Sequence, residues 1–125
     1  MMEGFQKAVL VVEDEADLRE LFSLMLEGEK IEVLQAGDGT EALRLLEQRG
    51  ATIDLIVTDM NLPGADGPKV MARAREIAPG AKILVMSGYG GTDMLSEVKG
   101  ADGFMTKPFN PTQALATVKQ LLQLP

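Results

Sequence analysis

The stretch Ala8-Val9-Leu10-Val11-Val12-Glu13-Asp14 sets the fold: five apolar residues end in two carboxylates. An uninterrupted apolar run of this length predicts a strand buried on both faces, as in a parallel sheet. Apolar residues at helical spacing come next, and Gly28 lies near the end of that segment. They predict an amphipathic helix whose inward stripe is Leu18, Leu21, Phe22, Met25 and Leu26.

The same strand-then-helix pattern repeats along the rest of the chain. The predicted strands are Ala8–Val12, Ile31–Gln35, Leu55–Thr58, Lys82–Met86 and Gly103–Lys107. The later predicted helices are Thr40–Gln48, which Gly50 ends, Val70–Ala78, Thr92–Lys99 and a last one that begins at Pro111 with Asn110 as N-cap. This alternation predicts a parallel sheet with helices on both faces. Because five pairs are too few for an eight-stranded barrel, we expect a doubly wound, flavodoxin-like α/β fold with strand order 2-1-3-4-5.

The composition excludes several classes of protein. The chain has 125 residues, which predicts a single domain over 1–125, and 46% of them are hydrophobic, enough for a packed core. It has neither cysteine nor histidine, which excludes disulfides, thiol nucleophiles, histidine metal sites and Ser-His-Asp catalysis. The net charge of −7 disfavours direct binding to nucleic acid or to an anionic membrane. No apolar run approaches the roughly 20 residues of a membrane span and no signal peptide opens the chain, so we expect a cytoplasmic protein without membrane insertion.

Polar residues follow the predicted strands at the edge where such sheets bind ligands. The first strand ends in Glu13 and Asp14, and the third ends in Asp59. The fourth ends in Ser87 and the fifth in Lys107. Carboxylates this close repel one another unless a cation lies among them, and oxygen ligands favour Mg²⁺, with Mn²⁺ as a substitute. A carboxylate, a hard dication, a lysine and a hydroxyl are together the groups that phosphoryl transfer requires.

Each of these residues also has a plain structural interpretation when it is taken alone. Glu13 and Asp14 are typical of solvated surface, and Asp59 of a helix cap or turn. Ser87 alone fits a turn, and Lys107 alone fits a surface lysine. A calcium loop that starts at Asp59 is excluded because its twelfth position lacks the required glutamate. The joint occurrence of these residues at four strand ends of one sheet favours a functional site.

Four segments of the chain resemble one known family, the CheY-like receiver domains of two-component response regulators. The resemblance runs from about Lys7 to about Leu122, and the segments stand in the right order at the right strand ends. This combination is highly specific and implies the (βα)5 receiver fold. The matching segments are Val11-Val12-Glu13-Asp14-Glu15, Val57-Thr58-Asp59-Met60-Asn61-Leu62-Pro63-Gly64-Ala65-Asp66-Gly67, Met86-Ser87-Gly88-Tyr89 and Phe104-Met105-Thr106-Lys107-Pro108-Phe109.

The resemblance implies roles in phosphorylation and Mg²⁺ binding for the acidic residues. Asp59 would be the phosphoacceptor, which attacks phosphorus from a partner's phosphohistidine. Asp14, Asp59 and the backbone carbonyl of Asn61 would bind Mg²⁺ directly. Glu13 stands where the family more often has aspartate, and it would act mainly through metal-bound water. Asn61 and Tyr89 would flank the approach of hydrolytic water and tune the lifetime of the phosphoryl group.

The remaining family positions imply a conformational switch. Ser87 would bond a phosphoryl oxygen, and Lys107 would pair with Asp59 before transfer and with the phosphoryl group afterwards. The peptide bond between Lys107 and Pro108 is expected to be cis. Phe104 takes the aromatic switch position without the hydroxyl of a tyrosine, and it would follow Ser87 inward on packing alone. Taken without the resemblance, Phe104 fits a core residue equally well.

The resemblance also implies partners. Because the chain has no histidine, its phosphodonor would be a histidine kinase, a histidine phosphotransfer protein or a small phosphodonor. The signal would leave through the fourth helix, fifth strand and fifth helix to an output domain or protein, and phosphorylation is compatible with a homodimer. Its own chemistry would be limited to self-phosphorylation and hydrolysis of the aspartyl phosphate, so we do not expect an enzyme in the ordinary sense.

Three other functions are weighed against this one. The first is a phosphorylation-independent interaction module with the receiver fold, which is disfavoured because the chain keeps every acidic residue and the lysine. The second is a phosphatase of the haloacid-dehalogenase type, which would need an aspartate where the chain has Asn61. The third is an FMN carrier, which is disfavoured because the chain has one tyrosine and no tryptophan. Whether the domain acts alone or within a longer regulator or hybrid kinase stays open.

Overall fold

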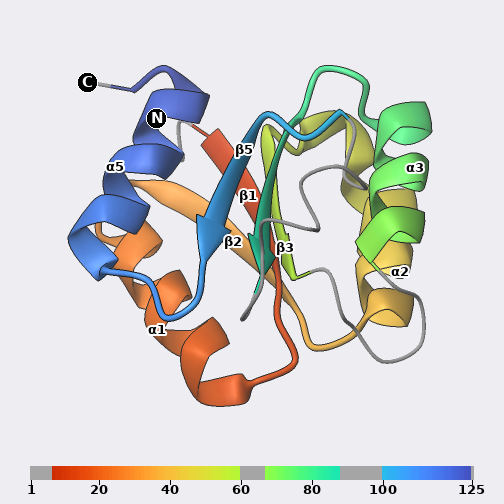
Figure 1. Ribbon diagram of the computed structural model, residues 1–125. Helices are drawn as coiled ribbons and strands as arrows, with labels where there is room; N and C mark the ends of the chain where they lie inside the picture. Colours follow the sequence, from red (N-terminus) through yellow and green to blue (C-terminus); the bar gives the residue numbers. More distant parts are fainter. Residues whose placement is uncertain (1–6, 60–66, 88–99, 125) are drawn as a thin grey trace.

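The computed structural model describes residues 7–59, 67–87 and 100–124 (Figure 1). In these residues a parallel sheet of five strands has the order β2-β1-β3-β4-β5. The predicted doubly wound, flavodoxin-like fold is therefore confirmed. The elements are β1 (Lys7–Val12), α1 (Ala16–Glu27), β2 (Ile31–Ala36), α2 (Gly39–Arg49), the 3₁₀ turn η1 (Gly50–Thr52), β3 (Leu55–Asp59), α3 (Gly67–Ile77), β4 (Lys82–Ser87), β5 (Gly103–Thr106) and α5 (Pro111–Leu122).

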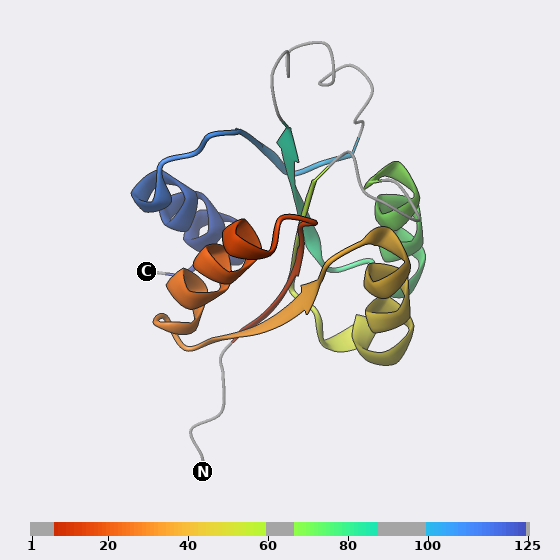
Figure 2. The same cartoon turned by 90° about the horizontal axis from the view of Figure 1, so that it is seen from below.

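The described helices form two layers, one on each face of the sheet. Helices α1 and α5 cover one face, and α2 and α3 cover the other (Figure 2). Successive residues of a strand point to opposite faces, so β1 contributes to both layers. Val9 and Val11 pack in the cluster under α1 and α5, whereas Leu10 and Val12 pack in the cluster under α2 and α3. This double burial is the physical reason for the uninterrupted apolar run of β1.

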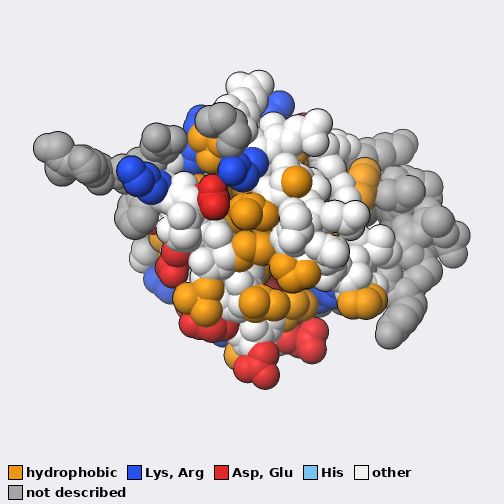
Figure 3. Space-filling model, turned by 90° about the vertical axis from the view of Figure 1, so that its left-hand side faces the viewer, with side chains coloured by type: hydrophobic (Ala, Val, Ile, Leu, Met, Phe, Trp, Pro, Cys, Tyr) orange, Lys and Arg blue, Asp and Glu red, His pale blue; other side chains and the backbone are white. Residues whose placement is uncertain are grey.

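Helix α1 shows where the predicted apolar stripe is too wide. Phe22 and Leu26 are fully buried against the sheet, as expected. The expectation for Leu21 is wrong, because its side chain is 49% exposed. Leu24 is exposed as well, and Figure 3 shows hydrophobic side chains gathered on this side of the molecule, over α1 and α5. A residue next to the buried one lies about 100° around the helix, which moves Leu21 off the face that Phe22 buries.

The helix ends follow the capping chemistry of their residues. Asn110 caps α5 as predicted, because its side chain accepts hydrogen bonds from the backbone N–H groups of Thr112 and Gln113. Gly50 ends α2, but the chain then continues as η1, which the sequence does not reveal. A Cβ atom at Gly50 would collide with the Ile77 side chain, so glycine is required where α2 and α3 meet.

Two further expectations concern the last part of the chain. The Lys107–Pro108 peptide bond is cis, as expected, and β5 ends one residue earlier than predicted, at Thr106. The helix predicted over Thr92–Lys99 lies outside the described residues. Among the helices in the described ranges, none has both the length and the apolar character that crossing a membrane requires.

Candidate functional site

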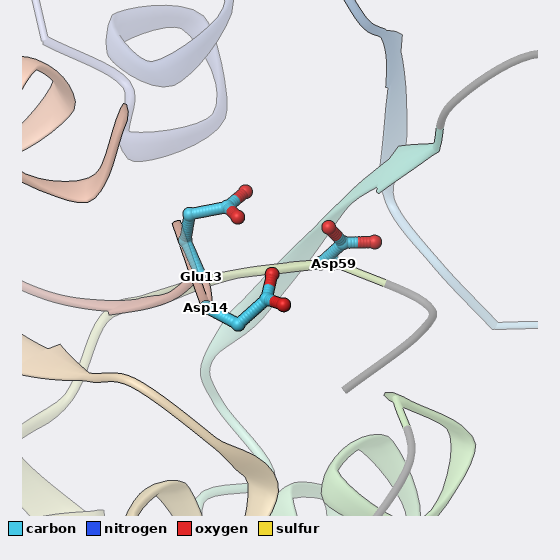
Figure 4. A group of neighbouring side chains, drawn as sticks. All are labelled: Glu13, Asp14 and Asp59. Atoms are coloured by element: carbon cyan, nitrogen blue, oxygen red, sulfur yellow. The ribbon is translucent and has the colours of Figure 1, made fainter. Parts of the chain in front are cut away.

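Parallel strands bring three carboxylates together at the carboxyl edge of the sheet. β1 pairs with β3 so that Val12 lies beside Thr58, which places the residues that follow side by side. Glu13, Asp14 and Asp59 each offer a carboxylate oxygen, and these oxygens lie within 4.8 Å of one another. Figure 4 shows the three side chains directed into one shared space. We call them the acidic cluster.

Lys107 reaches this cluster from the end of β5. Its Nζ atom donates a hydrogen bond to Oδ2 of Asp59 at 2.6 Å. The same atom lies 2.5 Å from Oε1 of Glu13, an ion pair in which that oxygen lacks hydrogen-bond geometry. Lys107 therefore bridges two carboxylates that come from different strands.

Glu13 is the most deeply placed member of the acidic cluster. Its residue is only 1% exposed, and its Oε2 atom accepts a hydrogen bond from the backbone N–H of Glu15 at 2.9 Å. Burial raises the pKa of Glu13, and the contacts with Lys107 and the Glu15 N–H offset that rise only in part. Because burial disfavours the charged form of Glu13, a cation bound next to its carboxylate oxygens would be favourable.

Lys107 responds to burial in the opposite way. Burial alone lowers the pKa of Lys107, but the hydrogen bond to Asp59 and the contact with Glu13 outweigh it, so the net shift is upward. The ammonium group is therefore held in its charged form at neutral pH. One ammonium against three carboxylates still leaves the site negatively charged.

The chemistry of the donors fits a hard divalent cation. All three members of the acidic cluster supply carboxylate oxygens, and Asp14 is exposed to solvent, so the cation would keep water ligands. Within this cluster, Oε1 of Glu13 is buried and pairs with the Lys107 ammonium but has no partner with hydrogen-bond geometry. These features match Mg²⁺ better than a soft metal, which would need thiolate or imidazole ligands.

The other predicted site residues divide into described and undescribed positions. Phe104 on β5 is 44% exposed, so its side chain is not a core residue in this state, and Pro108 is exposed too. Ser87 ends β4, where its backbone pairs with Thr106, but its side chain is not among the described parts. Asn61 and Tyr89 lie outside the described residues.

Sequence reasoning missed two features of the site. It did not predict the direct ion pair between Glu13 and Lys107, because the reach of a glutamate depends on the twist of β1 relative to β5. It also did not select Arg19, whose guanidinium donates a hydrogen bond to the carbonyl oxygen of Glu13 at 2.7 Å. The available signal was an arginine at the fourth position of the helix that follows Asp14.

The fold and the acidic cluster together define a CheY-like α/β domain with an acidic site at the carboxyl ends of its strands. A sequence profile described as the response regulator receiver domain matches residues 9–119. The chain therefore belongs to the response regulator receiver domain family. Such domains are the phosphoacceptor modules of two-component signalling, and this is the function class of the chain.

Individual relatives agree with this assignment. The chain is 31% identical to sporulation initiation phosphotransferase F of Bacillus subtilis over 93% of its own length and 94% of the relative. It is 36% identical to the sensor kinase CckA of Brucella abortus over 92% of its own length, but it spans only 12% of that kinase. A solved response regulator receiver protein from Sinorhizobium medicae superimposes with a TM-score of 0.83 at 32% identity, covering 98% of both chains.

Proposed function

We propose that Asp59 of this receiver domain accepts a phosphoryl group in a Mg²⁺-dependent reaction. The observation that carries the proposal is the contact of the Asp59 carboxylate with Lys107 at 2.6 Å inside the acidic cluster. Asp59 is nearly buried, at 8% exposure, yet it stands at a strand end that a donor can approach. Asp14 supplies a further oxygen for the cation, and Glu13 acts mainly through metal-bound water.

The transfer forms one bond and breaks another. A carboxylate oxygen of Asp59 attacks phosphorus on a donor's phosphohistidine, and an acyl phosphate bond forms. The phosphorus–nitrogen bond breaks, its electron pair stays on the imidazole nitrogen, and that nitrogen takes up a proton from solvent. Because the chain contains no histidine, the donor is a kinase, a phosphotransfer protein or a small phosphodonor.

Several groups of the site would compensate the negative charge of the transferred phosphoryl group. Asp14, Asp59 and the Asn61 carbonyl would hold Mg²⁺ directly, and Glu13 would act mainly through metal-bound water; the bound ion would supply positive charge to the phosphoryl oxygens. Lys107 exchanges its bond to Asp59 for a bond to a phosphoryl oxygen. Glu13 keeps its ion pair with Lys107 during this exchange, so the ammonium group stays in place.

The position of β4 and β5 beside the site supports a conformational switch. Ser87 stands at the end of β4, and Val85 pairs with Phe104 on β5. A phosphoryl group on Asp59 draws Ser87 toward it, and the exposed Phe104 ring turns inward toward the space that opens. Addition of fluoroberyllate with Mg²⁺ is expected to slow amide exchange in β5 and in residues 88–99, and unchanged exchange would contradict the switch.

The partners follow from the same chemistry. We place a histidine kinase or histidine phosphotransfer protein upstream, and an output domain or protein downstream at the face that includes β5 and α5. The domain turns over only its own aspartyl phosphate, so it is not a general phosphatase. Steady hydrolysis of phosphate esters in excess over the protein would contradict this.

The decisive experiment is phosphorylation by acetyl phosphate. With Mg²⁺, the intact mass of the chain is expected to increase by one phosphoryl group, and hydroxylamine is expected to remove it because acyl phosphates are labile. Asp59→Asn is expected to abolish the increase, whereas EDTA is expected to suppress it in the unsubstituted chain.

A matched control substitution lies at the same edge of the sheet. Asp38 caps α2 by accepting a hydrogen bond from the backbone N–H of Glu41 at 2.7 Å, and it is outside the acidic cluster. Asparagine caps helices as well as aspartate, so Asp38→Asn is expected to fold and to be labelled normally. Equal labelling of the Asp59→Asn and Asp38→Asn variants would show that Asp59 is not the acceptor.

A further inference from the structure

Arg19 on α1 joins the ends of two neighbouring strands beside the acidic cluster. Its Nη1 atom donates a hydrogen bond to the backbone carbonyl oxygen of Glu13 at 2.7 Å. Its Nε atom donates to Oε1 of Gln35, near the end of β2, at 3.3 Å. One guanidinium group therefore binds both Glu13, which follows β1, and Gln35 on the neighbouring strand β2. No function assigned above uses this side chain.

The loop after β2 leaves room for the guanidinium. A Cβ atom at Gly37 would lie 3.2 Å from Nη1 of Arg19, closer than ordinary van der Waals contact allows. The absence of a side chain at Gly37 leaves room for the guanidinium beside the Glu13 carbonyl. An alanine at this position would move the guanidinium by a few tenths of an ångström without removing it, which offers a graded perturbation.

The Glu13 carbonyl matters because it belongs to the peptide group that joins Glu13 to Asp14. The N–H of Glu13 donates to the carbonyl of Ala36 at 3.0 Å, but its own carbonyl projects beyond the end of β1, where no paired strand residue follows. Arg19 supplies the hydrogen bond that fixes this peptide plane. The plane sets the directions in which the Glu13 and Asp14 side chains leave the backbone.

We propose that Arg19 is a positioning residue for the divalent cation: it orients the Glu13–Asp14 peptide so that both carboxylates face the cation. The inference rests on the proposed function, since it concerns the same acidic cluster. Groups that orient metal ligands typically change metal affinity by about 10–100-fold when they are removed. Arg19 acts on the acidic cluster through the backbone, because it donates to the Glu13 carbonyl oxygen and to the Gln35 side-chain amide oxygen rather than to a carboxylate of the cluster.

Charge alone predicts the opposite result, and this makes the proposal testable. A guanidinium near a dication site repels the dication, so a purely electrostatic role means that Arg19→Met tightens Mg²⁺ binding. A positioning role means that Arg19→Met weakens it. Arg19→Lys separates the two further, because lysine keeps the charge and lacks the planar fork that spans Glu13 and Gln35.

The experiment measures the dissociation constant of Mg²⁺ alone by calorimetric titration of the folded chain, with folding checked by circular dichroism. We expect Arg19→Met and Arg19→Lys to weaken Mg²⁺ binding about tenfold, and Gly37→Ala to weaken it roughly twofold. Gly28→Ala is the matched control, because a Cβ atom there meets only ordinary contacts at 3.7 Å and beyond. It is expected to leave the affinity unchanged.

A kinetic readout separates positioning from a general loss of structure. In acetyl phosphate reactions, the Mg²⁺ concentration for half-maximal rate is expected to rise in the Arg19 variants, whereas the rate at saturating Mg²⁺ stays near that of the unsubstituted chain. Unchanged or tighter Mg²⁺ binding by folded Arg19→Met would overturn the inference. If Asp59→Asn still accepts the phosphoryl group, the proposed acceptor is wrong, but the calorimetric series on Arg19 keeps its meaning.

Discussion

The two edges of the sheet use aspartate in opposite ways. At the amino edge, Asp54 accepts a hydrogen bond from the backbone N–H of Ala8 at 2.9 Å, and Asp102 accepts one from Ile83 at 2.8 Å. At the carboxyl edge, the acidic cluster crowds three carboxylates within 4.8 Å, and Lys107 pairs with two of them.

The direction of the strands explains this difference. Parallel strands present free backbone N–H groups at one end and free carbonyl groups at the other. Carboxylates at the amino edge complete the hydrogen bonding of the strands, so they stabilise the fold. The three carboxylates of the acidic cluster lie close together with one ammonium group, that of Lys107, among them, so their remaining repulsion favours binding of a divalent cation. Structure is reinforced at one edge and a binding site is built at the other.

The sharpest test of the comparison is addition of Mg²⁺. At a concentration of 100 times its dissociation constant, Mg²⁺ is expected to raise the free energy of unfolding by about 2.7 kcal/mol. Asp14→Asn at the carboxyl edge is expected to lose most of this gain, and Asp102→Asn at the amino edge to keep it. Urea unfolding in EDTA and in Mg²⁺ measures the gain, and the comparison fails if both variants respond alike.

Removal of an amino-edge carboxylate is expected to have the next largest effect. Asp102→Ala leaves the backbone N–H of Ile83, a fully buried strand residue, without its acceptor. The expected loss of stability is about 1–3 kcal/mol, the cost of an unpaired buried donor. Asp102→Asn retains a side-chain carbonyl acceptor and serves as the control. Equal midpoints for both variants in urea would mean that this hydrogen bond does not stabilise the strand.

Glu13→Gln at the carboxyl edge is expected to act in the opposite direction when Mg²⁺ is absent. Because burial raises the pKa of Glu13 above its ordinary 4.5, stability falls as pH rises from 4.5 through the raised value. Glutamine removes that fall, so at pH 7 in EDTA the variant is expected to have a higher free energy of unfolding than the unsubstituted chain. Below pH 4.5 the gain is expected to vanish. If the variant is destabilised at both pH values, the buried charge of Glu13 does not destabilise the folded chain at pH 7, and the prediction is wrong.

The smallest expected effect concerns Lys107 in alkali. Its pKa in the folded chain is raised above 10.5, so its stabilising contribution is fully present below 10.5 and is lost as pH rises through the folded value. Lys107→Arg stays charged over that range. The free energy of unfolding, measured by urea unfolding from pH 9 to pH 12, is therefore expected to fall by less than about 1 kcal/mol more in the unsubstituted chain than in the variant. Parallel curves would show that the contacts with Asp59 and Glu13 contribute little.

The strand ends could be predicted from sequence because a buried parallel strand has an unmistakable pattern. The run before Glu13 and the one that ends at Asp59 placed both residues at one edge, and the structure brings them together with Lys107. Leu21 was misplaced because helical spacing defines a stripe but not its width, which depends on how α1 lies against the sheet. The bridge between Glu13 and Lys107 depends on side-chain reach across the two strands, β3 and β4, that lie between β1 and β5, and the spacing of residues in the sequence does not contain this information.

The sheet also insulates the two helical layers from each other. The apolar cluster under α1 and α5 and the one under α2 and α3 share no residue, because alternate strand positions serve opposite sides. Paired truncations such as Leu26→Ala with Leu46→Ala are therefore expected to add in free energy within about 0.5 kcal/mol. Substitutions that adapt the outward surface of one helical layer to a new partner are therefore expected to leave the packing of the opposite layer unchanged.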